Sequence, residues 1–189
     1  MKISSRQTRL FYFVKAAHGE QKRKYTNLPY WTHLWSVAEI VSGYPDIEMG
    51  IEIALCHDLL EDTPCTSKEL DEYLLDNGYH DWQDRMKIVR DVSHLTDEYT
   101  SETYPELNRA TRKNLEAKRL IGITPNAQSV KYADIIDNTS SIVQYDLGFA
   151  KVYLQEISAK IYKMDKGNPD LYKRCLETVE NAVNNLVER

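Results

Sequence analysis

The sequence predicts a single all-α domain. No stretch alternates polar residues with β-branched or aromatic ones, as a strand would require. Apolar side chains recur instead at intervals of three and four, and the few glycines and prolines lie at segment boundaries. The chain has 189 residues, of which 42% are hydrophobic, so it can bury one real core. It contains no internal repeat, low-complexity tract or linker, and we expect one domain over residues 1–189.

The first third of the chain is expected to form three helices. Apolar periodicity predicts them over residues 10–19, 32–43 and 47–60. Residues 20–30 are polar and basic and predict a turn between the first two. Because the third helix is apolar on nearly every side, it should be central and buried.

The middle of the chain predicts two further helices. Thr66 and Glu69 form a capping box, so a helix should begin there and end by Gly78. Residues 80–95 suit another helix, with its core side expected at Trp82, Met86, Val89 and Leu95. Residues 96–104 are polar and predict a loop.

Two prolines mark the starts of long helices in the last third. Thr124-Pro125 and Asn168-Pro169 each place a capping side chain before a first-turn proline. We expect C-terminal helices over residues 148–187, following a core over about residues 10–145. The final helix could pack on the domain or on a second subunit of a homo-oligomer, through Leu171, Cys175, Leu176, Val179, Val183 and Leu186.

Bulk properties exclude several functional classes. The formal net charge of −5 argues against a general nucleic-acid binder, which is normally basic. The three cysteines contain no C-x-x-C pair, so they indicate neither a disulfide framework nor a zinc ribbon. We expect reduced thiols in a cytoplasmic protein. No signal-peptide core and no window near ~18 apolar residues is present, so no membrane association is predicted.

The order His33, His57-Asp58, Asp134 is the most informative pattern in the chain. Neutral imidazoles and carboxylates suit one divalent first-row metal with positions left open for water and substrate. The middle element places four ionisable groups within residues 57–62 of an otherwise apolar stretch. Burying such charges without a partner costs several kcal/mol each. A metal is the simplest compensation.

Glu61 and Asp62 extend this pattern. If residues 54–62 are helical, each lies one turn after a candidate ligand and on the same face. A carboxylate close to a metal can take the proton of an attacking water. The alternative is that both residues begin a solvated loop before Pro64.

The remaining candidates also have plainer interpretations. Asp134 alone would more often pair with a nearby Arg or Lys, and His33 alone would more often be a satisfied core histidine. Asn138 lies one turn after Asp134, where its amide suits a sugar hydroxyl or a base edge. His18 could touch a substrate, but we expect it to cap a helix.

Three motifs resemble those of the RelA/SpoT-type alarmone hydrolases, a branch of the HD superfamily. Residues 18–24, followed by 29–33, resemble the opening signature. Residues 57–63 (His-Asp-Leu-Leu-Glu-Asp-Thr) resemble the central motif, and residues 131–138 are similar to the last one. The motifs occur in the family's order, and the short chain resembles the stand-alone small alarmone hydrolases.

The resemblance implies a fold and a reaction. The fold would be an HD-type helical bundle with a metal site at its centre. His33, His57, Asp58 and Asp134 would hold one metal, which is Mn²⁺ in this family. Glu61 and Asp62 would orient and deprotonate the water that attacks the 3′-diphosphate of ppGpp or pppGpp. The products would be pyrophosphate and GDP or GTP.

The resemblance also implies substrate contacts. Arg23 would stack on the base and Lys24 would reach phosphate, while Asn138 would contact the nucleoside. Ser141 stands where the family usually has a small hydroxyl residue. A basic cluster in this acidic chain could balance the two diphosphates, with Arg112 or Lys113 as candidates among Arg109, Arg112, Lys113, Lys118 and Arg119. The alternative is a solvated helix face with Glu106 and Glu116 as partners.

Three departures from the family leave the substrate open. Leu34 replaces a usual proline, Glu20 replaces a usual glycine, and the turn at residues 25–28 is one residue longer than the common form. An HD-type phosphohydrolase of another nucleotide with a 2′- or 3′-phosphate, such as NADPH or an adenine alarmone, is therefore a second hypothesis. A nucleotide-binding module without turnover is a third.

Overall fold

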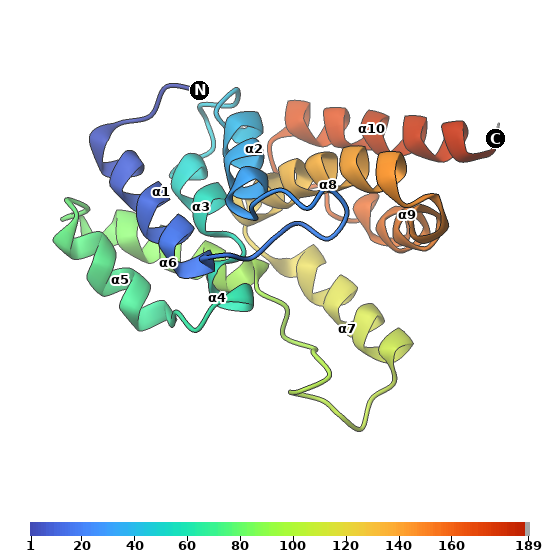
Figure 1. The fold of residues 1–189 in the computed structure, drawn as a ribbon, viewed down its shortest axis with the longest axis horizontal. Helices are drawn as coiled ribbons and strands as arrows, with labels where there is room; N and C mark the ends of the chain where they lie inside the picture. The colour runs from blue at the N-terminus through green and yellow to red at the C-terminus, as the bar shows by residue number, and fades with distance from the viewer. Residues whose placement is uncertain (188–189) are drawn as a thin grey trace.

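The computed structural model describes residues 1–187, and within that range it contains helices and no sheet, which confirms the predicted all-α class. One isolated bridge joins Lys22 and Pro29 across the loop after the first helix. Figure 1 shows the arrangement of α1 (Ser5–His18), α2 (Trp31–Val41), α3 (Gly50–Cys56), α4 (Leu59–Asp62), α5 (Ser67–Asp76), α6 (Trp82–Leu95), α7 (Arg109–Gly122), α8 (Pro125–Tyr145), α9 (Leu147–Ile161) and α10 (Pro169–Val187).

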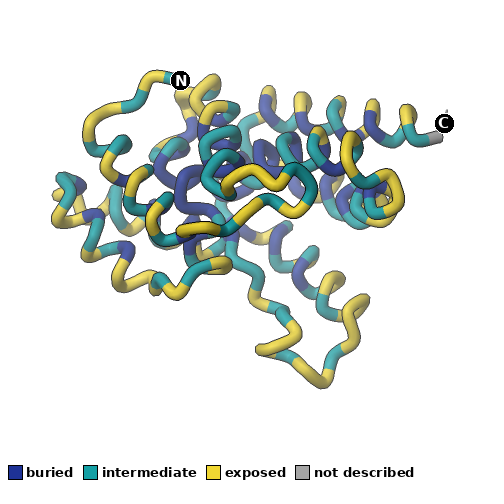
Figure 2. Tube along the Cα trace, viewed as in Figure 1, coloured by how far each residue is buried: buried dark blue, intermediate teal, exposed yellow. Residues whose placement is uncertain are grey.

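Helix α3 lies at the centre of the bundle, as its apolar sequence predicts. It packs against α1, α2, α6 and α8, and Figure 2 shows the buried segments gathered there. Ile53, Ala54, Leu55 and Cys56 have no exposed surface. Helices α9 and α10 pack on α8, and α7 with the loop before it extends away from this core (Figure 1).

The capping signals place the helix starts correctly. The Thr66 hydroxyl accepts from the Glu69 amide at 3.2 Å, and the Glu69 carboxylate accepts from the Thr66 amide at 2.8 Å. Helices α8 and α10 begin at Pro125 and Pro169. The first helix starts earlier than predicted, at Ser5, because Ser4 and Gln7 form a second capping box.

The segment 47–60 is not one helix, so that prediction is wrong. Helix α3 ends at Cys56, and Asp58, with φ −103° and ψ 2°, separates it from α4. The His57 ring contributes to this break because its Nδ1 contacts the Ala54 carbonyl at 2.8 Å. That bond satisfies a carbonyl left without a partner at the end of α3.

The buried face of α6 was also predicted incorrectly. Trp82 and Met86 are 61% and 47% exposed, whereas Ile88 and Val92 are fully buried. The face that meets α3 and α8 is therefore rotated from the predicted one, with Leu95 common to both. Aromatic side chains often keep solvent contact at a domain edge, so Trp82 was a weak guide.

Helix α10 packs on its own domain. Leu171, Cys175 and Val179 are buried against α8 and α9, whereas Leu176, Val183 and Leu186 are only partly buried. The three cysteines are free thiols, in agreement with the predicted absence of a disulfide framework. Across residues 1–187, every helix is too short or too polar to cross a membrane.

Candidate metal centre and adjoining cleft

Four predicted ligands come together from three separate parts of the chain. His33 comes from α2, His57 and Asp58 from the break between α3 and α4, and Asp134 from α8. One ligand atom from each of His33, His57 and Asp58 lies within 4.8 Å of the other two. Asp134 Oδ1 completes the cluster, at 3.2 Å from His33 Nε2 and 3.8 Å from His57 Nε2.

The donor atoms of this cluster fit a divalent metal. His33 and His57 are 2% and 1% exposed, and their Nε2 atoms lie only 3.2 Å apart. The Nδ1 atoms are engaged elsewhere, with Asp137 at 2.7 Å and the Ala54 carbonyl at 2.8 Å. Both acceptors favour a proton on Nδ1, which leaves the two Nε2 lone pairs facing the centre. Converging lone pairs and carboxylate oxygens are what a cation requires.

Electrostatics keeps the carboxylates of the cluster ionised. Burial alone would raise the pKa of Asp58, but positive charge on the neighbouring His57 and His33 rings, whose own pKa values are raised, lowers it below its ordinary value. A bound divalent metal would supply that positive charge instead and leave both imidazoles neutral. Asp134 is likewise held below its ordinary pKa, chiefly by Lys131, whose Nζ lies 2.8 Å from Oδ2. Asp134 Oδ2 thus pairs with a lysine, which is its plainer interpretation, while Oδ1 faces the histidines.

A cleft of about 600 Å³ opens beside the cluster between α4, α7, α8 and α9. Asp58 and Asp134 lie on its wall with four more carboxylates, those of Glu61, Asp97, Glu116 and Glu156. Six cationic side chains also line it: Arg109, Lys113, Lys118, Lys131, Lys160 and Lys163. Burial, followed by repulsion from Lys131 and Lys113, lowers the pKa of Lys160 to about 8. This crowding of positive charge suits a polyanionic ligand.

The two acidic residues of α4 are adjacent in one helix and therefore point in different directions. Glu61 lines the cleft and accepts a hydrogen bond from the Asp97 amide at 3.0 Å. Glu61 is exposed to solvent on the side that faces the cleft. Partial desolvation, with repulsion from Asp97, raises its pKa to about 7. The continuous helix that would have stacked Glu61 beside His57 and Asp62 beside Asp58 is broken at Asp58.

Asp62 lies outside the lining of the cleft and faces the loop after α1. It accepts from Gln21 Nε2 at 2.9 Å, and Gln21 Oε1 lies 2.6 Å from His18 Nδ1. The His18 ring stacks on Tyr30 with centroids 5.0 Å apart, and the Tyr30 hydroxyl donates to Asp58 at 2.7 Å. His18 is thus the buried end of a polar network, a role that the expected helix cap did not include.

The predicted nucleoside contacts surround the last motif. Arg23 lies 2.7 Å from Asp137 and 3.5 Å from the Asn138 amide oxygen. Asn138 lines the cleft and donates to Asp134 at 2.6 Å. Ser141 donates to the backbone carbonyl of Asp137 at 3.1 Å, and its hydroxyl is engaged there.

Lys24 is exposed to solvent and lies near the cleft. Its ammonium is 5.3 Å from the centre of the Phe149 ring, and Phe149 lines the cleft. Helix α7 carries the basic cluster predicted at residues 109–119, but the structure does not bring Arg112 to the cleft. Its guanidinium donates to the Leu107 carbonyl, because at the start of the helix it turns back toward the preceding loop. Lys113 does line the cleft, whereas Arg112 does not.

Several cleft residues were not found from the sequence. Lys160 and Lys163 come from α9 and the turn after it, and Asp97 from the loop before α7. None of them belongs to a motif, and only the helical spacing of the two lysines marks them as sharing a face. Asp137 is in the last motif, but its contact with His33 depends on the packing of α2 on α8.

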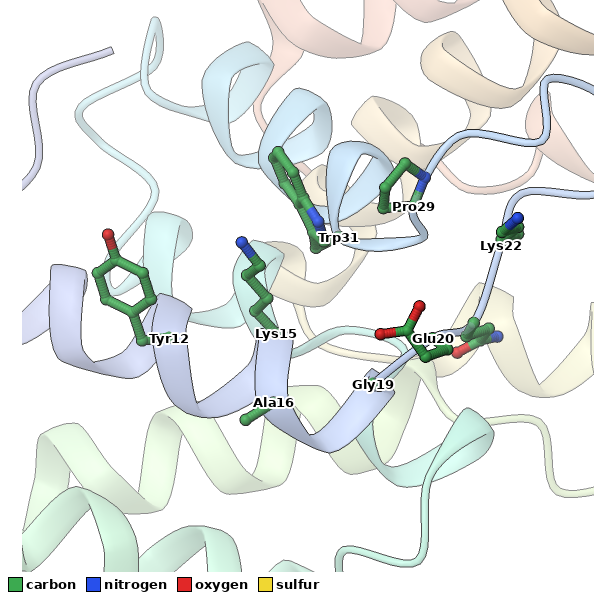
Figure 3. Close-up of a pocket in the computed structure, with 9 residues that line it drawn as sticks. Tyr12, Lys15, Ala16, Gly19, Glu20, Lys22, Pro29 and Trp31 are labelled. Carbon is green, nitrogen blue, oxygen red and sulfur yellow. The ribbon is translucent and has the colours of Figure 1, made fainter.

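A second hollow of about 410 Å³ lies behind the loop that carries Arg23. Figure 3 shows it between α1 and the start of α2, with Lys15 and Trp31 side by side. The Lys15 ammonium lies 4.6 Å from the centre of the Trp31 ring. The predicted metal ligands are not among its lining residues, so it is separate from the cleft.

Comparison with known proteins identifies relatives of similar sequence. No protein-family model matches it. It is 34% identical over 130 residues to human guanosine-3′,5′-bis(diphosphate) 3′-pyrophosphohydrolase MESH1, an alignment that covers 67% of this chain and 63% of that protein. It is 39% identical over 62 residues to the GTP pyrophosphokinase rsh of Brucella ovis and of Brucella abortus, covering 33% of this chain and 8% of each relative. The chain thus spans less than two thirds of the length of these curated relatives.

A solved structure has the same fold. That protein is described as a metazoan ortholog of SpoT that hydrolyses ppGpp and plays a role in starvation responses. The TM-score is 0.75 at 20% sequence identity, over 96% of this chain and 97% of the other. The chain therefore shares the fold of that solved structure, and in sequence it is similar to RelA/SpoT-like proteins, as its three motifs predicted.

Proposed function

We propose that this protein is a metal-dependent 3′-pyrophosphohydrolase of ppGpp and pppGpp that releases pyrophosphate and GDP or GTP. One observation carries the proposal: the His33, His57, Asp58 and Asp134 cluster opens directly into a cleft with cationic walls. The named activity of the human relative gives independent support.

The cluster would hold one metal, and Mn²⁺ is the ion we propose. When bound, such a metal supplies Lewis-acid chemistry that activates water and polarises a phosphoryl oxygen. Glu61 is the group that we propose to take the proton of the attacking water. It lines the cleft, and a base with a pKa near 7 has both the affinity for a proton and a substantial ionised fraction at neutral pH.

Asp62 has a supporting role in this proposal. Its bond to Gln21 ties α4 to the loop after α1, and this fixes the short helix on which Glu61 lies. The orientation of the Glu61 carboxylate also depends on the Asp97 amide. We therefore propose that Glu61 transfers the proton and that Asp62 maintains the geometry.

The cationic residues of the cleft match a substrate with two diphosphates. Lys131 and Lys160 line the space beside the cluster, and Lys118 and Lys163 line it further along. Arg109 and Lys113 also line the cleft, where they are paired with Glu156 and Asp97. Charge-assisted hydrogen bonds from such groups to phosphate oxygens are strong and balance the negative charge. Arg23, Lys24, Asn138 and Ser141 lie toward the other end, and we propose that this end receives the nucleoside. Arg112 has no part in the proposal.

We also infer a cytoplasmic location, since three free thiols fit a reducing compartment. The ligand we propose is a small nucleotide.

Product analysis tests the proposed reaction. The purified protein with Mn²⁺ is incubated with ppGpp and, in parallel, with NADPH and pppApp. We expect pyrophosphate and GDP from ppGpp, with activity abolished by a chelator and by Asp58→Ala. Asp76→Ala, an exposed residue outside the site, is the matched control and should keep full activity. Monophosphate release from NADPH with ppGpp unchanged would contradict the proposal, as would metal-loaded protein that turns over none of the substrates.

A further inference from the structure

One carboxylate on α8 holds two parts of the site together. Asp137 Oδ2 lies 2.7 Å from His33 Nδ1 and 2.7 Å from Arg23 Nη2. Its other oxygen, Oδ1, accepts from the Ser36 hydroxyl at 2.5 Å. The Asp137 and Arg23 side chains are 11% and 13% exposed, so these contacts are largely shielded from water.

The contact with His33 sets the state of a proposed metal ligand. A carboxylate at Nδ1 favours a proton on that atom, so Nε2 keeps its lone pair. Nε2 faces Asp134 and Asp58 at 3.2 Å and 3.6 Å. His57 uses only a backbone carbonyl for the same purpose. An ionised acceptor makes the stronger hydrogen bond, so His33 is the more firmly fixed ligand.

The contact with Arg23 fixes the loop between α1 and α2. Arg23 is always charged, and Asp137 is its carboxylate partner in the structure. The same guanidinium reaches toward the Asn138 amide oxygen at 3.5 Å. Without Asp137, the Arg23 guanidinium would have only a distant neutral acceptor at this largely shielded position. We expect it to turn toward solvent instead, where water can hydrate its charge. Its planar face would then no longer be held beside Asn138.

We propose that Asp137 is a positioning residue shared by the metal centre and the nucleoside-binding loop. The carboxylate orients His33 toward the metal and holds Arg23 where the nucleoside is proposed to lie. Loss of Asp137 therefore weakens metal binding and substrate binding together, whereas loss of Arg23 weakens substrate binding alone. The substrate half of this inference rests on the proposed function, and the metal half does not.

The test uses the full-length protein with Asp137→Asn, which keeps the size of the side chain and removes its charge. Titration with Mn²⁺ in the absence of substrate should show about 10- to 100-fold weaker binding, as is usual when a partner of a metal-binding histidine is lost. Asp76→Asn is the matched control, because it makes the same change at an exposed position outside the site. Arg23→Ala should bind Mn²⁺ with wild-type affinity.

Steady-state kinetics at saturating Mn²⁺ tests the link to the loop. Arg23→Ala and Asp137→Asn should each raise KM for ppGpp, and the double variant should have nearly the same KM as Asp137→Asn alone. Multiplicative effects of the two changes on KM would overturn the link. Wild-type Mn²⁺ affinity in a folded Asp137→Asn protein would overturn the role at the metal centre.

Two further results distinguish failure of this inference from misfolding of a variant and from failure of the proposed function. If Asp137→Asn loses its helical circular dichroism, Ser36→Ala replaces it, since that change removes one bond to the same carboxylate. It should weaken Mn²⁺ binding by about 2- to 10-fold, and unchanged affinity would overturn the inference. If the wild-type protein leaves ppGpp intact, the proposed function fails, while the Mn²⁺ titrations still decide the role of Asp137.

Discussion

Replacing Glu61 by glutamine tests the role of the proposed base without changing any proposed ligand of the metal. Glutamine has the same length, and its amide oxygen can accept the Asp97 amide hydrogen as the carboxylate does at 3.0 Å. The helix α4 and the cluster beside it should therefore be preserved. The change removes the negative charge and the ability to take a proton.

The expected loss of rate follows from that role. A positioned general base contributes about 10²- to 10⁴-fold to a rate. Such a loss raises the barrier by about 2.7 to 5.4 kcal/mol, at about 1.36 kcal/mol for each factor of ten. We expect the loss in kcat, with Mn²⁺ content unchanged and KM for ppGpp close to the wild-type value, because Glu61 is not a proposed ligand of the metal.

The pKa of Glu61 gives this prediction a pH signature. Partial desolvation and Asp97 raise the pKa from 4.5 to about 7, so the ionised base becomes abundant only as the pH rises through 7. The rate of the wild-type protein should increase over that range. A glutamine side chain does not titrate, so the residual activity of Glu61→Gln should lack that rise.

The same shift predicts a gain in stability for Glu61→Gln. A carboxyl whose pKa is higher in the folded protein binds protons more tightly there, so its ionisation opposes folding. The opposition grows between pH 4.5 and about 7 and is fully present above it. The Tm of Glu61→Gln should therefore exceed that of wild type at pH 8 and match it below pH 4.5. Full activity in Glu61→Gln, or a rate that falls only with metal content, would refute the assignment of Glu61 as the base.

Two other predictions concern the packing and charge of the fold. Gly167→Ala should destabilise the protein by about 1 to 3 kcal/mol in urea unfolding, because its Cβ would lie 2.5 Å from a Tyr132 ring carbon. Gly122→Ala, where nothing lies within 4 Å, is the control, and equal midpoints for the two variants would contradict the predicted clash. For Lys160, whose pKa is lowered to about 8, we expect the wild-type KM for ppGpp to rise as the pH passes 8 and the ammonium loses its proton. Lys160→Met should have a raised KM at pH 7 without that additional rise, and a KM equal to that of wild type at pH 7 would exclude a phosphate contact.

Local features of the sequence determined the helical class and most helix starts. The capping box at Thr66 and the prolines at 125 and 169 each act within one turn of the helix that they begin. The order of His33, His57-Asp58 and Asp134 was equally readable, because a motif lies along the chain. The same holds for the buried character of α3, which is apolar on nearly every side and needs no particular partner.

Only the tertiary structure decided how the site is built. The packing of α4 directs Glu61 to the cleft and Asp62 to Gln21 of the loop after α1, and the packing of α2 on α8 brings Asp137 to His33. Helix α9 brings Lys160 to the cleft from outside every motif. These results depend on contacts between residues far apart in the chain, whose energies arise only when the helices pack together. Local periodicity determines which side of a helix is apolar, but the neighbouring helices determine which charged group faces which.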